Sequence, residues 1–186
     1  MARSLARAFH DDSVWKWFMP DDATRAQRLE RMFATFARNV YLRHGNDCYT
    51  TDAYEGAALW APPGHEHMST ADILRILPGW TKAIGWRELF RAKRGVDSLE
   101  KVHPHERHYY LPFVGVAPES QGRRLGTALM RPVLEKCDRE RMPAYLEATS
   151  VGSRKCYERV GFHRRAEERV AGDGPPFWTM WRAPAS

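Results

Sequence analysis

Residues 114–127 combine residue types that can bind an anion. An apolar run from Tyr109 to Val116 ends near Pro118, and a short loop with two glycines and two arginines leads into an amphipathic segment. A strand, a loop and a helix N-terminus in this order present backbone N–H groups to a ligand, and the helix dipole adds partial positive charge. The guanidinium groups would add formal charge for phosphate oxygens. The stretch predicts a phosphate-binding loop.

Two common phosphate-binding templates do not fit this loop. It contains neither the G-x-G-x-x-G of dinucleotide-binding folds nor the G-x-x-x-x-G-K-[ST] of P-loops. A second motif, Tyr157-Glu158-Arg159-Val160-Gly161-Phe162, follows after enough residues for one helix and one strand. Gly161 is expected to end a helix, and Phe162 to begin the next strand.

Together the two motifs resemble the GNAT superfamily of acyl-CoA N-acyltransferases. The run Gln121-Gly122-Arg123-Arg124-Leu125-Gly126 is similar to that family's Gln/Arg-x-x-Gly-x-Gly/Ala loop, and residues 157–162 are similar to the signature that ends its core. The resemblance is strongest to the puromycin N-acetyltransferase-like branch and covers most of the chain. Within that branch it rests on residues 110–116, 143–149 and 157–159, and on the strand end at Trp60, Ala61 and Pro63.

The resemblance implies an α/β GNAT acyltransferase fold, with a mixed central sheet flanked by helices and splayed between the family's fourth and fifth strands. Those strands would be Tyr109–Val116 and Ala144–Ala148. The chain starts inside what resembles the family's first helix, so the usual first strand is expected to be missing. An uncovered sheet edge would make a homodimer reasonable. Residues 1–186 are expected to form a single domain, with an acceptor-side half over about 1–108 and an acetyl-CoA-binding core over about 109–186.

The activity that the resemblance implies is transfer of the acetyl group of acetyl-CoA to a primary amine of a small molecule by direct attack, without an acyl-enzyme. Tyr157 is the expected acid for the departing thiolate, because a phenol can donate its proton to a thiolate. Glu147 is the candidate base, although it could equally bind a cationic amine or be an inward charge paired with an arginine. The residues expected to bind the cosubstrate are Val114, Gly115, Val116, Gln121, Gly122, Arg123, Arg124, Leu125, Gly126, Thr127, Ser153 and Tyr157, with a backbone N–H near Val116 polarising the thioester carbonyl.

Two other functions stay open. Arg124 stands where the family usually has glycine. A positive φ at this position would strain the backbone, whereas any other φ would leave the arginine as an added phosphate contact. We favour the phosphate contact. A decayed loop would leave a non-catalytic module that binds acyl-CoA or acts as a scaffold. The acceptor could also be a protein or peptide amine, because a shared fold does not identify the acceptor.

Composition limits the partners and the compartment. A length of 186 residues with 43% hydrophobic content is typical of one globular domain, and no apolar run is long enough to span a membrane. The net charge of +6 favours an anionic partner, but the charges are dispersed and no DNA-binding motif is present, so no nucleic-acid partner is expected. Three separated cysteines indicate no disulfide framework, and the N-terminus lacks an apolar signal core, so the expected compartment is the cytoplasm.

The histidines and aromatic residues allow a functional and a structural interpretation. His65, His67, His103, His105 and His108 lie in expected loops without acidic or thiol ligands at a familiar spacing, so we expect exposed histidines and no metal. Aromatic side chains are more often core than pocket, and we expect about two of six candidates to touch the acceptor. The six are Trp15, Trp17, Phe18, Trp60, Trp80 and Trp86.

Hydrophobic periodicity and helix-breaking residues predict the remaining elements. Ser69 and Asp72 indicate a capping box, and Pro78-Gly79 is expected to break the helix that follows, giving further helices at about 80–94 and 98–102. The other predicted helices are 2–9, 23–44 (ending at Gly45 and Asn46), 125–142 and 153–160. The other predicted strands are 48–51, 56–60, 162–170 and 177–181, and 14–20 is predicted as a loop.

Overall fold

The computed structural model describes residues 1–43 and 47–185. Its helices are α1 (Ala2–Phe9), α2 (Ser13–Phe18), α3 (Asp22–Phe36) with a π-helical extension η1 (Ala37–Tyr41), α4 (Thr70–Ile84), α5 (Leu89–Val102), α6 (Leu125–Glu140) and α7 (Val151–Glu158). Its strands are β1 (Cys48–Thr50), β2 (Gly56–Ala61), β3 (Tyr109–Val116), β4 (Ala144–Ala148), β5 (His163–Arg169) and β6 (Pro176–Arg182). Short 3₁₀ turns lie at Pro118–Ser120 and Val170–Gly172.

The strands form one mixed sheet in the order β1-β2-β3-β4-β6-β5. Only β3 and β4 run parallel, and each of the other neighbouring pairs is antiparallel. This confirms the predicted α/β fold with a mixed sheet flanked by helices. Within the described residues the sheet begins at β1, and no strand lies ahead of α1.

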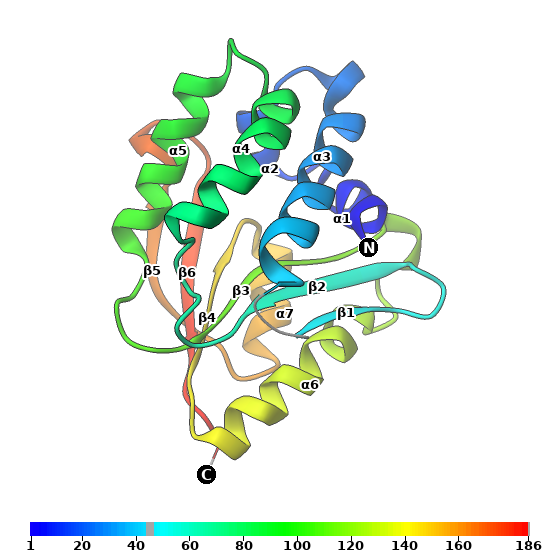
Figure 1. Cartoon of the computed structure of the whole chain (residues 1–186). Coiled ribbons are helices and arrows are strands. Elements are labelled where there is room, and N and C mark those ends of the chain that lie inside the picture. The colour runs from blue at the N-terminus through cyan, green and yellow to red at the C-terminus, as the bar shows by residue number, and fades with distance from the viewer. Residues whose placement is uncertain (44–46, 186) are drawn as a thin grey trace.

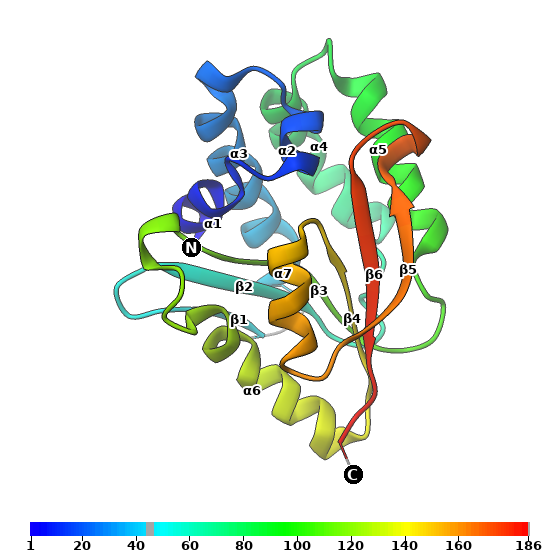
Figure 2. The same ribbon diagram turned by 180° about the vertical axis from the view of Figure 1, so that it is seen from behind.

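The pairing of β3 with β4 is short. It consists of Tyr109 opposite Ala144 and Tyr110 opposite Tyr145, although β3 continues to Val116 and β4 to Ala148. The two strands therefore part after two paired residues each. Figures 1 and 2 show them diverging in the middle of the molecule. Beyond Tyr110, the edge of β3 that β2 does not cover is left without a neighbouring strand.

The sheet separates two apolar cores. Alternate residues of β2 point to opposite faces: Ala57, Leu59 and Ala61 join the core under the N-terminal helices, whereas Ala58 and Trp60 join the core under α6 and α7. All six residues of β2 are buried, which explains its continuous apolar sequence. In both views α1 to α5 gather at one end of the molecule and α6 lies at the other, with the sheet between them.

The predicted loop at 14–20 is wrong, because residues 13–18 form α2. Asp12 is the reason: its Oδ1 accepts hydrogen bonds from the backbone N–H groups of Val14 and Trp15, at 2.9 and 3.2 Å. This satisfies donors that an uncapped helix start would leave open. The predicted helix end at Gly45 and Asn46 lies outside the described residues.

The predicted break at Pro78-Gly79 is also wrong. The capping box of Ser69 and Asp72 starts α4 as expected, but the helix continues through both residues and ends at Gly85, where φ is +81°. A Cβ on Gly79 would lie 2.5 Å from the Thr35 hydroxyl oxygen. The glycine is therefore explained by the close approach of α4 to α3, and the predicted helices at 80–94 and 98–102 are parts of α4 and of the single helix α5.

Helix α1 packs closely against β3 at Gly115, which has no side chain. A Cβ on Gly115 would lie 2.7 Å from the Cβ of Ala8. We expect Gly115→Ala to lower the free energy of unfolding by about 1–3 kcal/mol, because overpacking forces the helix away from the strand. Chemical denaturation measures this.

The matched control is Gly152→Ala in α7, whose added Cβ would meet only the Ser150 hydroxyl at 3.9 Å. Its stability should stay equal or rise by up to about 1 kcal/mol, because alanine favours helix. Equal stabilities of the two variants would contradict the close packing of α1 on β3.

Candidate active site

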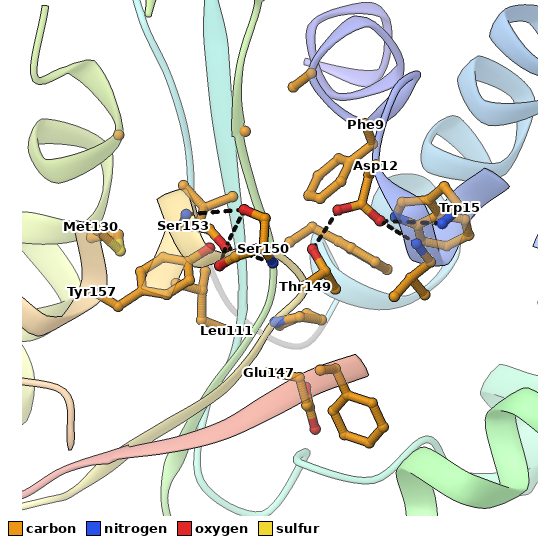
Figure 3. Close-up of a pocket in the computed structure, with 18 of the residues that line it drawn as sticks. Phe9, Asp12, Trp15, Leu111, Met130, Glu147, Thr149, Ser150, Ser153 and Tyr157 are labelled. Carbon is orange, nitrogen blue, oxygen red and sulfur yellow. Dashed lines mark hydrogen bonds between the residues drawn. The ribbon is translucent and has the colours of Figure 1, made fainter. Parts of the chain in front are cut away.

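One cavity of about 640 Å³ runs from the loop after β3 to the helices α3, α4 and α5. Figure 3 shows part of its lining, with Tyr157 and Ser153 on one side, Thr149 beside Asp12, and Glu147 apart from them on β4. Its walls come both from residues 1–108, the expected acceptor-side half, and from residues 109–186, the expected acetyl-CoA-binding core. The cavity passes through the gap where β3 and β4 part.

The backbone at one end of the cavity is arranged for an anion. Gly122 has a φ of +79°, and Arg124 adopts the left-handed conformation with φ +61° and ψ +16°. Arg124 is the residue before α6, and no side chain caps this helix. The N–H groups of Leu125, Gly126 and Thr127, which line the cavity, therefore have no partner within the helix. An anion at this place would receive those donors and the positive end of the helix dipole.

The loop side chains divide into two groups. Gln121 holds the loop against the strand, since its Nε2 donates to the carbonyl oxygen of Val116 at 3.1 Å. Arg123 binds Glu55, which also accepts from Ser120, and Arg123 is not among the residues that line the cavity. Arg124 does line it, and no ion pair of its side chain occurs among the described residues. Of the two arginines, only Arg124 is placed for a ligand.

Strand β3 supplies the middle of the cavity wall. Val114, Gly115 and Val116 all line it, and β2 pairs with them along the opposite edge. Because β4 has already diverged, the backbone groups on the free edge have no strand partner. An extended ligand with amide groups could pair with this edge as an added strand does.

Tyr157 and Ser153 come from α7. A capping box holds Ser153, whose backbone N–H donates to the Ser150 hydroxyl at 3.0 Å while its own hydroxyl accepts from the Ser150 N–H. Tyr157 follows one turn later and is buried against Phe162. Burial, aided by the neighbouring Cys156 and by Asp12, raises the pKa of Tyr157 well above its usual value. The phenol therefore keeps its proton and can act as a donor.

Glu147 lies deep in the cavity with only part of its bonding capacity used. Its Oε2 accepts a hydrogen bond from the Tyr110 hydroxyl at 2.9 Å. Its Oε1 has no hydrogen-bond partner and lies 3.7 Å from Nδ1 of His103. Among the described residues no arginine pairs with Glu147, so that alternative for this carboxylate does not hold. Burial, and then the charge of Glu147, raise the pKa of Tyr110 well above its usual value.

Comparison with known proteins supports the chemistry of these elements. Residues 81–162 match the acetyltransferase (GNAT) family. An uncharacterized N-acetyltransferase of Schizosaccharomyces pombe is 27% identical over 180 residues, which cover 87% of this chain and 68% of the relative. Residues 81–162 therefore carry the sequence pattern of a GNAT acetyltransferase domain.

Solved structures agree in fold. A structure from Corynebacterium glutamicum, described as histone acetyltransferase HPA2 and related acetyltransferase, has a TM-score of 0.69 at 24% identity, over 100% of this chain and 90% of that one. An N-acetyltransferase from Staphylococcus aureus has a TM-score of 0.60 at 14% identity, over 97% and 94% of the two chains. The predicted enzyme class, a GNAT acetyltransferase dependent on acetyl-CoA, is confirmed, and the puromycin N-acetyltransferase-like branch stays a resemblance.

Asp12 is a residue of the acetyltransferase site that the sequence analysis missed. The Thr149 hydroxyl donates to its Oδ2, so Asp12 joins α2 to the end of β4 across 137 positions of sequence. Burial raises the pKa of Asp12, while hydrogen bonds from Thr149, Trp15 and Val14 oppose that shift. Asp12 could have been recognised as a helix cap from the residues that follow it, but its contact with Thr149 has no local sequence signal.

The expectation of exposed histidines is wrong at two positions. His103 and His108 are buried, and their rings lie 5.1 Å apart between centroids. His103 lies in the cavity wall, and His65 and His67 are exposed as expected. The reason is that β3 and β4 carry Tyr110 and Tyr145, whose rings pack edge-on against His103. No group of side chains suited to a metal ion occurs in residues 1–43 and 47–185.

The six aromatic candidates fall into three environments. Trp15, Phe18 and Trp80 line the cavity. Trp60 is fully buried in the core under α6, and Trp17 packs partly buried against Phe18. Trp86 is neither core nor pocket, because its side chain is 79% exposed. Within the described residues, no helix of the acetyltransferase is long and apolar enough to cross a membrane.

The bridging role of Asp12 can be measured against a matched helix cap. Asp21 caps α3 through the Ala23 N–H at the surface, without a long-range partner. We expect Asp21→Ala to lower the free energy of unfolding by about 1 kcal/mol. Asp12→Ala should cost about 2–3 kcal/mol, because it also leaves the Thr149 hydroxyl without its partner. Equal losses in denaturant titrations would show that the Asp12–Thr149 contact contributes nothing beyond the cap.

Proposed function

We propose that this acetyltransferase transfers the acetyl group of acetyl-CoA to the primary amine of a small molecule by direct attack. The observation that carries the proposal is the continuity of the cavity. It joins uncapped helix amides at α6, the free edge of β3, the buried phenol of Tyr157 and the buried carboxylate of Glu147. An anionic cosubstrate and a cationic acceptor would meet where β3 and β4 part.

The residues present fit coenzyme A. The amides of 125–127 and the Arg124 guanidinium would hold the pyrophosphate, while Gln121 keeps the loop closed on the strand. The free edge of β3 would pair with the amide groups of the pantetheine arm, and an N–H near Val116 would polarise the thioester carbonyl. The φ of Arg124 is positive, so the unstrained backbone that our favoured interpretation assumed is wrong, but the residue lines the cavity, which supports a phosphate contact.

The proton transfers follow from the buried groups. Glu147 takes a proton from the acceptor ammonium, and the free amine then attacks the thioester carbonyl carbon. As the carbon–sulfur bond breaks, Tyr157 donates its phenolic proton to the departing thiolate, and the nitrogen of the new amide releases its second proton to solvent. Tyr157 then regains a proton from solvent, and Glu147 releases the one that it took. The raised pKa of Tyr157 keeps the phenol protonated as the pH rises. No residue becomes acylated.

A small-molecule acceptor is favoured by the enclosure of the far end of the cavity. The side chains of His103 and Glu147 are only 7% and 8% exposed, and Tyr41 and Phe36 beside them are buried. A protein or peptide acceptor would have to insert one extended side chain. Acyl-CoA binding without turnover is the second candidate, and the strained Arg124 is the observation that favours it.

Removal of the phenol tests the catalytic proposal. We expect Tyr157→Phe to lower kcat by about 100-fold, because the thiolate then leaves without a proton donor. The dissociation constant of acetyl-CoA, measured by calorimetry, should stay within about twofold, because the ring remains in place. Thiol release by the wild type should not decline between about pH 8 and 10 through ionisation of Tyr157, whose pKa is raised. An unchanged kcat in the variant would remove Tyr157 from the acid role.

Substitution of Arg124 tests whether the loop between β3 and α6 binds acetyl-CoA or has lost this function. Arg124→Gly should relieve the left-handed strain and leave stability equal or raise it by about 1 kcal/mol. It should also weaken acetyl-CoA binding about fivefold through loss of one charged contact. Arg131→Gln, an exposed arginine on α6 away from the cavity, serves as the charge-matched control. Unchanged affinity in Arg124→Gly would contradict the phosphate contact.

A further inference from the structure

Glu147 and His103 form an incomplete polar cluster in the cavity wall. Both side chains are more than nine-tenths buried, yet Oε1 of Glu147 and Nε2 of His103 have no hydrogen-bond partner. The distance of 3.7 Å between Oε1 and Nδ1 allows attraction but not a hydrogen bond. A buried carboxylate oxygen without a partner is costly, so the structure leaves a place for a donor.

Asp12, another of the carboxylates that line the cavity, provides a contrast. Both oxygens of Asp12 are occupied, Oδ1 by the α2 backbone and Oδ2 by Thr149. Asp12 is therefore explained by its structural contacts, whereas Glu147 is not. The arginines that line the cavity, Arg124 and Arg159, come from its α6 and α7 side. Neither forms an ion pair with Glu147 in the described part of the chain.

Other groups near Glu147 do not supply a permanent positive charge. Tyr110 donates to Oε2, and burial and the charge of Glu147 raise the pKa values of the Tyr41 and Tyr145 phenols. The Tyr145 hydroxyl also lies near enough to Glu147 for hydrogen bonding to raise its pKa further, but it forms no hydrogen bond of good geometry. His67 packs against His103 and lies 3.9 Å from Glu100, and His108 has its pKa lowered by burial. Glu66 accepts a hydrogen bond from the His108 backbone N–H. Besides the histidines, the cation nearest to this cluster is Arg165, which acts on Tyr145 and forms no ion pair with Glu147 among the described residues, so the carboxylate can bind a cationic ligand.

Apolar side chains make up much of the wall around this cluster, beside Glu66 and Glu100. Phe36 and Tyr41 come from α3 and its π-helical extension, Trp80 and Ile84 from α4, and Leu99 from α5. They surround the end of the cavity opposite the loop that joins β3 to α6. Burial of apolar surface there would stabilise a hydrocarbon or ring body and would offer little to a polar chain.

We infer that the acceptor is a small primary amine with an apolar, ring-bearing body, bound through its ammonium group to Oε1 of Glu147. The body lies between Trp80, Tyr41 and Leu99. The ammonium donates the hydrogen bond that Oε1 of Glu147 lacks, beside His103. This inference rests on the proposed function and narrows its acceptor. It assigns specificity to Glu147 together with the apolar wall, so both the charge and the ring are required.

Three matched probes test the requirement for charge and ring. 3-Phenylpropylamine carries both, 3-phenylpropan-1-ol lacks the charge, and 3-aminopropan-1-ol lacks the ring. Thiol release from acetyl-CoA should show a kcat/KM at least about 30-fold higher for 3-phenylpropylamine than for 3-aminopropan-1-ol. A higher rate with 3-aminopropan-1-ol, or with a peptide carrying a free N-terminus, would overturn the inference while leaving an acetyltransferase.

Equilibrium binding separates this inference from the proposed function. In calorimetry with CoA-loaded protein, the dissociation constant of 3-phenylpropylamine should be at least about tenfold lower than that of either other probe. Binding in this order without thiol release from acetyl-CoA would reject the proposed transfer and still support the acceptor site. Absence of preferential binding would overturn the site whatever the turnover.

Two variants test the named contacts. Glu147→Gln should weaken 3-phenylpropylamine at least about tenfold and leave 3-phenylpropan-1-ol within about twofold, a pattern that general loss of structure would not produce. Glu135→Gln, exposed on α6, is the matched control. Val96→Trp, from the α5 part of the wall, should reduce kcat/KM for 3-phenylpropylamine by about tenfold, a larger loss than for 3-aminopropan-1-ol. Equal effects on charged and uncharged probes in Glu147→Gln would overturn the role of its carboxylate.

Discussion

The arrangement of the site depends on the early parting of β3 and β4. Two parallel strands that stayed paired would satisfy each other's backbone groups and leave no gap in the sheet. Here the pairing ends at Tyr110 and Tyr145, although both strands continue. Polar backbone groups then face a cavity, which is stable only where water or a ligand can reach them. The gap therefore combines an opening through the sheet with an exposed edge of hydrogen-bonding groups.

The surrounding elements hold this gap open from both sides. Gly115 lets α1 approach β3 closely, and Asp12 joins α2 to Thr149 at the end of β4. The N-terminal helices are thus attached to each diverging strand separately. On the far side, bidentate contacts between Arg182 of β6 and Asp138 of α6, at 2.7 and 2.8 Å, connect the sheet to the helix that presents the anion loop. Such paired charged hydrogen bonds constrain orientation as well as distance.

The cavity is electrostatically polar along its length. One end carries the uncapped N-terminus of α6 and Arg124, and the other carries Glu147 among phenols and histidines. An anionic cosubstrate and a cationic acceptor would be drawn to opposite ends and would bring their reactive atoms together between them. Tyr157 lies along the same cavity with a raised pKa, so its proton is available at physiological pH.

The amino-acid sequence by itself determined the family, the mixed α/β fold and the loop after β3, because these depend on local signals. A strand, two glycines and a helix start lie next to one another at 109–127, and Tyr157–Phe162 carries its own helix stop. The left-handed Arg124, the buried His103 and the bridge from Asp12 to Thr149 were decided only by tertiary structure. Each of these depends on contacts between residues far apart in the chain. The helix through Pro78 shows the same limit: α4 continues past the proline, and Gly79 there lies close to Thr35 of α3, a contact with no local sequence signal.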